Sequence, residues 1–340
     1  MRNSRPSLST ALISAALAAL LLPTARAHAA ETAAADQTPL PVAIVDALNK
    51  LSGGPHAGYR ANHAKGVLVT GSFTPAAGAK ALSRAAQFSK TVPVLVRFSN
   101  ATGLPTMLDA DGGASPHGMA IRFQLGGGAS TDIVAISANG FPVATPEEFR
   151  DFLQAAGASG PGAKRPTPVE QFLGSHPAAL AFVMTPRPAP QSFGTLAFYG
   201  VNAFKFTNAR GAVRFIRYQI LPLAGEAALD AAEVAKAGPN YLMDELPQRI
   251  NKGAVKFRLL AQLAQDGDSL TDATQVWPAE RERVELGVLS LNKTPVEQLL
   301  AQKKLLFNPL SLAAGIEPSD DPVLLARPAA YGVSYGQRAR

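Results

Sequence analysis

The sequence predicts an α+β fold in which an antiparallel sheet carries accessory helices. Eight segments are rich in β-branched or aromatic residues, and each is bounded by Gly, Pro or Asp. The segment 208–211, Asn-Ala-Arg-Gly, is typical of a hairpin turn between two of them. The 340 residues are 47% hydrophobic and 17% charged, which indicates a globular chain with a sizeable core. We therefore expect about eight strands that close into an antiparallel barrel.

The eight expected strands alternate with helical patterns along the chain. Residues 41–51 place apolar side chains at helical spacing, and Thr145 followed by Pro146 is typical of a helix start at 145–155. Pro328 and Gly332 predict irregularity in a tail helix that starts at Pro322, after a polar loop at 317–322. The expected strands are 66–73, 92–99, 117–125, 132–137, 195–207, 212–221, 256–265 and 284–291, and the other expected helices are 167–172, 233–237 and 241–253.

Residues 1–29 are typical of a secretory signal peptide. Arg2 and Arg5 precede an apolar run at 11–22, which is too short to span a bilayer, and Ala27-His28-Ala29 fits a cleavage site. The alternative is an uncleaved anchor helix. We expect a single mature domain, residues 30–340, that is exported to the periplasm or secreted and has no stable membrane insertion.

Composition excludes several kinds of site. The chain has no cysteine, which excludes disulfides, thiolate metal sites and cysteine nucleophiles. It has five histidines, so a metal centre needs another ligand such as tyrosine. The formal charge of +7 falls to +4 without the leader, which contains three arginines and no acid. A nucleic-acid partner is therefore not expected.

A few polar residues stand out, and each has a structural alternative to a functional role. His63 precedes an expected strand, and Asn139 fits either a site or an ordinary turn. Arg97 lies within an apolar strand and needs an anion or a buried carboxylate. Arg327 and Tyr331 share one helix face, where the cation favours a phenolate suited to ferric haem; the alternative is a simple surface contact.

Seven sequence blocks then occur in an order that resembles the haem catalases, and more closely the short secreted catalase-related peroxidases. They span most of the chain beyond the leader, from Arg60 to Arg338. The blocks are RANHAKGVLVTGSF from Arg60, VRFS from Val96, SPHGMA from Ser115, DIV from Asp132 with NGFP from Asn139, FKFTNARG from Phe204, LFNP from Leu306 with GIEPS from Gly315, and RPAAY from Arg327.

This resemblance implies a catalase-like barrel that binds haem, expected to be haem b, and it implies a role for each matching residue. Tyr331 would ligate the iron, and Arg327 would keep it a phenolate. His63 would be the acid/base on the opposite, distal side, oriented by Ser99, and Asn139 would hydrogen-bond the peroxide. The resemblance further places Arg60, Arg97 and Arg338 at the haem propionates and Phe152 near the haem plane.

The resemblance also implies an activity, reduction of hydrogen or organic peroxides through a ferryl intermediate in oxidative-stress defence. Catalases have paired phenylalanines where Ala144 and Thr145 stand, Val where Asn62 stands, Arg where His117 stands, and longer termini. We therefore expect a peroxidase that uses a small organic reductant, as a monomer or homodimer. The alternatives are a true catalase, an allene-oxide-synthase-like enzyme, and an exported haem-storage protein.

Overall fold

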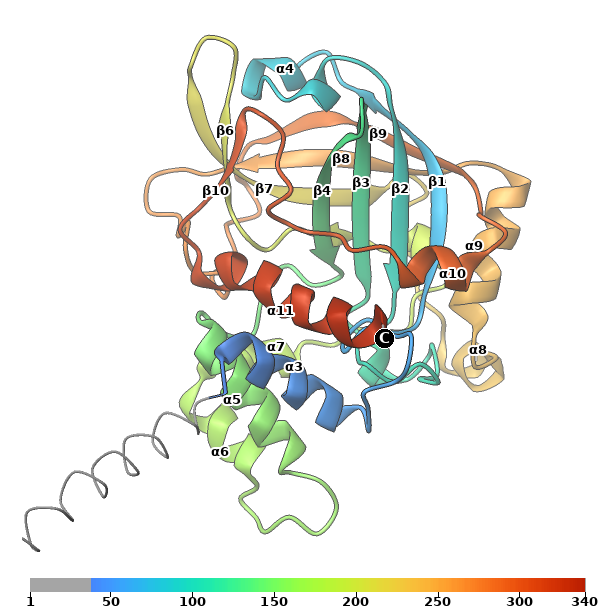
Figure 1. The fold of residues 1–340 in the computed structure, drawn as a ribbon, viewed down its shortest axis with the longest axis vertical. Coiled ribbons are helices and arrows are strands. Elements are labelled where there is room, and N and C mark those ends of the chain that lie inside the picture. The colour runs from blue at the N-terminus through green and yellow to red at the C-terminus, as the bar shows by residue number, and fades with distance from the viewer. Residues whose placement is uncertain (1–37, 340) are drawn as a thin grey trace, which may run out of the picture. The chain divides into compact units, whose positions relative to one another are not determined.

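The structure is a computed structural model that describes residues 38–339. The residues from Leu40 to Arg340 form one compact unit (Figure 1). The predicted signal peptide, residues 1–29, lies outside the described residues. Among the described residues, no helix is long and apolar enough to cross a membrane.

Ten antiparallel strands form one sheet, and most of them close into a barrel. The ring runs β7–β5–β4–β3–β2–β1–β9–β8 and returns to β7 through a β7–β8 pairing, so eight strands close it, as the sequence predicted. Strands β6 and β10 extend from β7 outside this ring. The strands are β1 Gly66–Pro75, β2 Val92–Ser99, β3 Gly118–Gly126, β4 Ala129–Ile136, β5 Phe198–Tyr199, β6 Phe204–Thr207, β7 Val213–Pro222, β8 Val255–Leu263, β9 Arg283–Lys293 and β10 Ile316–Pro318.

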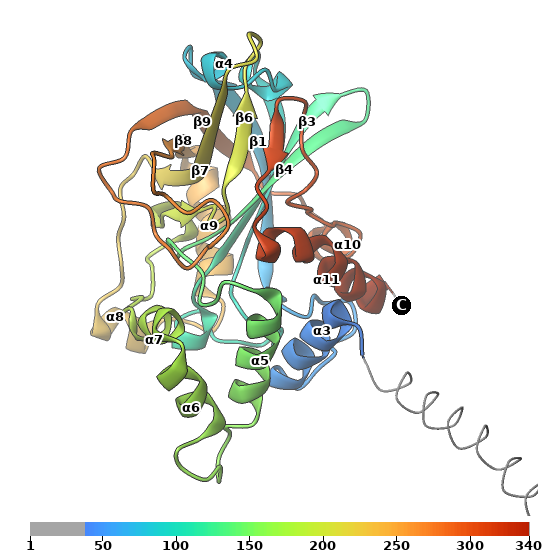
Figure 2. The same cartoon turned by 90° about the vertical axis from the view of Figure 1, so that its left-hand side faces the viewer.

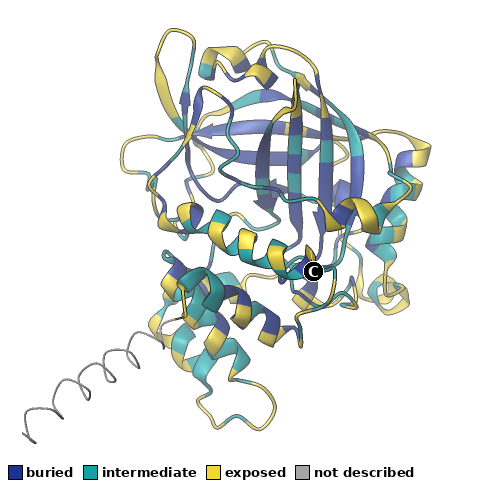
Figure 3. Ribbon diagram, in the orientation of Figure 1, coloured by how far each residue is buried: buried dark blue, intermediate teal, exposed yellow. Residues whose placement is uncertain are grey.

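Alternating side chains along the strands build the core inside the barrel. In β2 and β3, every second side chain faces a common apolar core, as a strand period of two requires. Aromatic rings fill this core: Phe98 contacts Phe193, Phe198 and Phe257 at ring-centroid distances of 5.3 to 5.9 Å. Figure 3 shows the barrel strands largely buried and the outer helix faces exposed.

One expected strand was wrong in part. Residues 195–207 form the two short strands β5 and β6 rather than one continuous strand. At Gly200 the backbone lies against Tyr218, where an added Cβ would come within 3.1 Å of the tyrosine Cβ. The following residues, Val201 and Asn202, then turn away from the ladder and line the cavity described below.

Three helices pack against one another at one end of the barrel (Figures 1 and 2). They are α3 (Leu40–Leu51), α5 (Pro146–Gly157) and α11 (Pro322–Ala339). The predicted helix start at Thr145 is confirmed: its side chain accepts a hydrogen bond from the Glu148 N–H in a capping box. The remaining helices are α4 Ala79–Leu82, α6 Pro168–Ser175, α7 Pro177–Met184, α8 Ala231–Lys236, α9 Tyr241–Lys252 and α10 Gln298–Lys303, with 3₁₀ turns at Ala86–Phe88, Gly112–Ala114 and Phe193–Thr195.

The tail helix is more regular than the sequence predicted. α11 continues through Pro328 and Gly332 without a break. Asp321 caps its first turn by accepting hydrogen bonds from the N–H groups of Val323 and Leu324. Sequence patterns did not predict α4, α7, α10 or β10.

Candidate haem site

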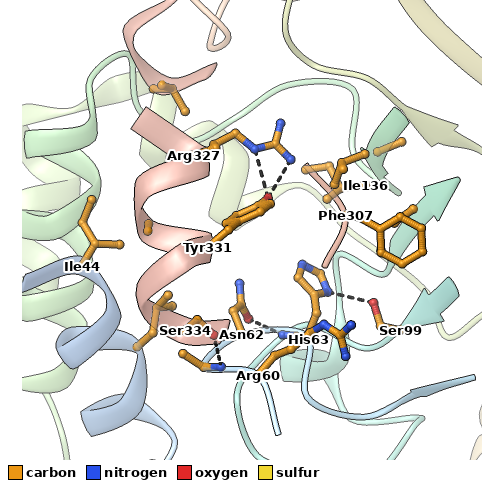
Figure 4. Close-up of a pocket in the computed structure, with 18 of the residues that line it drawn as sticks. Ile44, Arg60, Asn62, His63, Ser99, Ile136, Phe307, Arg327, Tyr331 and Ser334 are labelled. Carbon is orange, nitrogen blue, oxygen red and sulfur yellow. Dashed lines mark hydrogen bonds between the residues drawn. The ribbon is translucent and has the colours of Figure 1, made fainter. Parts of the chain in front are cut away.

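A large cavity lies between the barrel and the three packed helices. It contains about 1400 Å³ of empty space, including the part open to solvent. Strands β2, β3 and β4 form one wall, while α3, α5 and α11 contribute the others. Most of the lining is apolar, with side chains such as Ile44, Ile136 and Phe307 (Figure 4). A cavity with this apolar lining suits a large hydrophobic cofactor.

One face of α11 supplies the helical wall of the cavity. Arg327, Tyr331, Ser334 and Arg338 recur at intervals of four, three and four residues, so they project from one side of the helix. The Arg327 Nε and Nη2 atoms donate to the Tyr331 hydroxyl oxygen at 3.0 and 2.9 Å (Figure 4). Two donors from a cation stabilise negative charge on that oxygen. The predicted contact between the two side chains is therefore present.

Further hydrogen bonds hold the Arg327 guanidinium on the side away from Tyr331. Its Nη1 donates to the Asn202 side-chain oxygen at 2.8 Å, and the Asn202 amide donates to Asp321 at 2.7 Å. Asn202 and Asp321 are both buried. The guanidinium is thereby fixed in the plane that meets Tyr331.

His63 occupies the facing wall, at the entrance to β1. Its Nδ1 lies 2.9 Å from the backbone carbonyl oxygen of Asn100 and 3.2 Å from the Ser99 hydroxyl. Because a carbonyl oxygen only accepts, the neutral ring carries its proton on Nδ1. The unprotonated nitrogen is then Nε2, which has no hydrogen-bond partner among the described residues. His63 is therefore arranged to accept a proton at Nε2.

The backbone conformation at His63 and the space beside it orient the imidazole ring. His63 has φ of 55°, in the left-handed region that non-glycine residues rarely occupy. The Asn62 side-chain oxygen accepts from the His63 N–H at 3.0 Å and supports this conformation. Gly118 leaves space for the ring, since a Cβ there would come within 2.9 Å of His63 Nδ1 and 2.7 Å of Ser99 Oγ.

The surroundings keep His63 neutral. Burial, followed by the positive charge of Arg97, lowers its pKa to about 3. A second histidine, His117, is buried close by, and burial lowers its pKa to about 4. Its Nδ1 lies 3.2 Å from the Asn100 side-chain oxygen, and Asn100 in turn donates to Asp109 at 2.7 Å. This buried network holds the segment that positions Ser99.

Three arginines gather at the same cavity without a carboxylate. Arg60, Arg97 and Arg338 all line it, and none forms an ion pair with any described acid. Arg97 instead donates to the Gln302 side chain at 2.7 Å and to the Ala64 carbonyl at 3.0 Å, while Arg60 and Arg338 both donate to the Leu305 carbonyl. The alternative of a buried salt bridge at Arg97 is therefore wrong for the described residues.

The arginine cluster lacks a counter-charge. Burial, together with the charges of Arg97 and Arg338, lowers the pKa of Arg60 to about 7. Burial and the charge of Arg338 lower the pKa of Arg97 to about 9. Because guanidinium stays protonated in proteins, these shifts express the cost of burying cations, and of clustering them, without an anion. An anionic group in the cavity would offset that cost.

Two predicted site residues are not brought to the cavity. Asn139 lies on the loop after β4, is exposed, and does not line the cavity. Phe152 lies on α5, but its ring packs against Phe172 at a centroid distance of 5.5 Å. One turn earlier, Phe149 lines the cavity and contacts Phe141. The difference lies in packing: the Phe149 ring turns to the cavity, whereas the Phe152 ring packs against Phe172 on α6.

The residues present fit haem. The apolar walls suit a porphyrin, the three unpaired arginines suit its two propionates, and a tyrosine oxygen held by two guanidinium donors suits ferric iron. Among the described residues, no group of three or more His, Asp or Glu side chains could hold a metal ion. Sequence reasoning missed Asn202, Asp321, Gly118 and Phe149, because their roles depend on contacts between distant parts of the chain.

Comparisons with known proteins agree with this geometry. The catalase family model matches residues 56–340. A catalase-related peroxidase of Mycolicibacterium paratuberculosis is 36% identical, with 88% of this chain and 94% of that protein covered. A catalase-related peroxidase of Synechococcus elongatus is 34% identical, with 84% and 85% covered. A Vibrio vulnificus catalase is 29% identical and covers 80% of this chain, but only 56% of that catalase is matched.

Solved structures show the same fold. A fungal catalase superposes with a TM-score of 0.74 at 24% identity, covering 83% of this chain and 60% of that one. A bacterial catalase gives 0.72 at 23% identity, with coverage of 83% and 58%. The chain belongs to the catalase family, as a haem-dependent oxidoreductase of the catalase and peroxidase type that acts on peroxide.

Proposed function

We propose that this protein is a peroxidase that reduces hydrogen peroxide and organic peroxides with electrons from a small organic donor, in defence against oxidative stress. The observation that carries the proposal is the pairing of an unprotonated His63 Nε2 with an Arg327-held Tyr331 across one cavity (Figure 4). A storage protein needs the tyrosine but not the histidine. The catalase-related peroxidases reported above support the same function.

Tyr331 would hold the haem iron, and Arg60, Arg97 and Arg338 would hold the propionates; we propose haem b as the group. When bound, haem supplies the redox chemistry that stores the oxidising equivalents of the peroxide. The two Arg327 donors would stabilise negative charge on the Tyr331 oxygen, which suits that oxygen to ferric iron.

His63 would move the proton. At Nε2 it accepts a proton from one peroxide oxygen and returns it to the other, which leaves as water. The Nδ1–H bond to the Asn100 carbonyl persists throughout and keeps the ring in one orientation. Two electrons and two protons from the donor then complete the reduction of the second oxygen to water.

Two observations favour an organic donor over a second peroxide. The chain matches 94% and 85% of two catalase-related peroxidases, but only 56% of the Vibrio vulnificus catalase. Ala144 and the N-cap Thr145 directly precede α5, where the resemblance to catalases leads us to expect bulky phenylalanines, and they lie between Phe141 and Pro146, which line the cavity. Smaller side chains at these two positions would leave room for a donor larger than peroxide.

The test is a paired measurement on haem-loaded protein. Peroxide is added with an aromatic donor, and donor oxidation and oxygen release are followed together. Two donor molecules oxidised by one electron each per peroxide, with little oxygen, support the proposal. Half a molecule of oxygen per peroxide would instead indicate a true catalase, the candidate that the similarity to the Vibrio vulnificus catalase favours. Neither activity in fully loaded protein would indicate storage.

Location and assembly complete the proposal. We propose export to the periplasm or the exterior, on the evidence of the signal-like residues 1–29, and a monomer or homodimer. Mass spectrometry of the protein from fractionated cells tests export, with cleavage near Ala29 as the expected result. Uncleaved chain retained in the cytoplasm would contradict it.

A further inference from the structure

The distal wall holds an amide that the resemblance does not assign. Asn139, the residue expected to hydrogen-bond peroxide, is exposed and lies outside the cavity lining. Asn62, which stands where catalases have Val, lines the cavity directly beside His63. Its side chain is therefore the amide that the structure places next to the proposed proton acceptor.

A hydrogen bond fixes which way the Asn62 amide faces. One end of the amide lies 3.0 Å from the His63 backbone N–H. A backbone N–H only donates, so this end must be the oxygen, Oδ1. The NH₂ group, Nδ2, consequently faces the other way, and Figure 4 shows it directed into the space between His63 and Tyr331.

The two N–H groups of Asn62 Nδ2 are available to donate. No described residue accepts a hydrogen bond from it, and it is not among the buried polar atoms that lack partners, so it remains accessible from the cavity. The other end of the same amide is already tied to the His63 backbone N–H. A ligand oxygen or nitrogen entering the cavity beside His63 would find a fixed donor there.

We propose that Asn62, rather than Asn139, supplies the amide donor that binds peroxide on the His63 side of the cavity. The inference rests on the proposed function. Nδ2 donates to a peroxide oxygen while His63 Nε2 accepts the peroxide proton, so the two side chains hold the molecule from two directions. The same donor would stabilise the negative end of bound cyanide, which does not react further.

The test measures cyanide affinity by absorption titration of haem-loaded protein. Asn62→Leu removes both the donor and the tie to His63, whereas Asn62→Asp keeps an oxygen for the His63 N–H, removes the donor and adds a negative charge, which also opposes an anionic ligand. Both are expected to weaken cyanide binding by about tenfold. Asn139→Leu is the matched control and is expected to bind cyanide as the unaltered protein does.

Three outcomes decide between this inference and the alternatives. Wild-type affinity in Asn62→Asp together with weak binding in Asn62→Leu would show that Asn62 only positions His63, and would overturn the donor role. Weak binding in Asn139→Leu with unchanged binding in Asn62→Leu would also overturn it. Loss of peroxide reduction in His63→Gln, measured in parallel, shows that the proposed function stands even if the Asn62 inference fails.

Discussion

The two facing walls of the cavity are built in different ways. Arg327 and Tyr331 lie one turn apart on a single helix, so helix geometry alone brings them together. His63, Ser99 and Gly118 come from the entrance of β1, the end of β2 and the start of β3. The tyrosine wall therefore depends on local structure, whereas the histidine wall depends on strand register and on a left-handed residue. Substitutions should separate these two dependencies.

The largest effect is expected at the tyrosine wall. Tyr331→Phe removes the only atom through which this helix would ligate iron, so ordinary haem loading should be lost. The measurement is the Soret absorption of purified protein after incubation with haem. Tyr335→Phe, one turn further along α11 beside Arg338, is the control and should load normally. A full Soret band in Tyr331→Phe would refute the ligand assignment.

The next effect is expected at the histidine wall. His63→Gln retains a polar side chain but removes the proton acceptor, so peroxide consumption should fall by about 10²- to 10⁴-fold with haem loading preserved. Stopped-flow absorption of the loaded protein measures this rate. His176→Gln serves as the control, because His176 lies at the junction of α6 and α7 and does not line the cavity. Equal rates in the two variants would argue against His63 as the base.

A smaller effect tests the register of the histidine wall. Gly118→Ala places a methyl group within 2.9 Å of His63 Nδ1 and 2.7 Å of Ser99 Oγ, so the ring must shift. Misplacement of the base should slow peroxide consumption by between about 10- and 100-fold while haem still loads. Gly112→Ala is the matched control, because no atom lies within 4 Å of its added Cβ. An unchanged rate in Gly118→Ala would show that the wall tolerates movement of the ring.

The last effect is on folding rather than turnover, and it is a pH dependence of stability. His63 and His117 have pKa values lowered to about 3 and about 4 by burial, whereas in the unfolded chain they protonate below about pH 6.5. The unfolded state therefore binds more protons as the pH falls. The two histidines stabilise the fold fully above pH 6.5, and they should lose roughly 1.4 kcal/mol per pH unit each below it.

Urea denaturation of the haem-free protein between pH 7 and pH 4.5 measures this slope. His117→Gln removes one of the two histidines and should make the slope shallower. A free energy of unfolding that does not change over this range would contradict buried, neutral histidines at the cavity.

Sequence patterns predicted the parts of the molecule that depend on local physics. The barrel strands have a period of two, the Thr145 cap lies beside its Glu148 partner, and the Arg327–Tyr331 pair follows helix spacing. The rest depends on contacts between distant segments. Whether Asn139 reaches the cavity is set by the path of the loop after β4, and which α5 phenylalanine lines it is set by how that helix packs against its neighbours.

The most direct test of the central claim is the stoichiometry of peroxide turnover by haem-loaded protein in the presence of an aromatic donor. We expect two one-electron oxidations of the donor for each peroxide consumed, little release of oxygen, and loss of this turnover in His63→Gln. Oxygen release of half a molecule per peroxide, unaffected by the donor, would contradict the claim that this cavity serves a peroxidase.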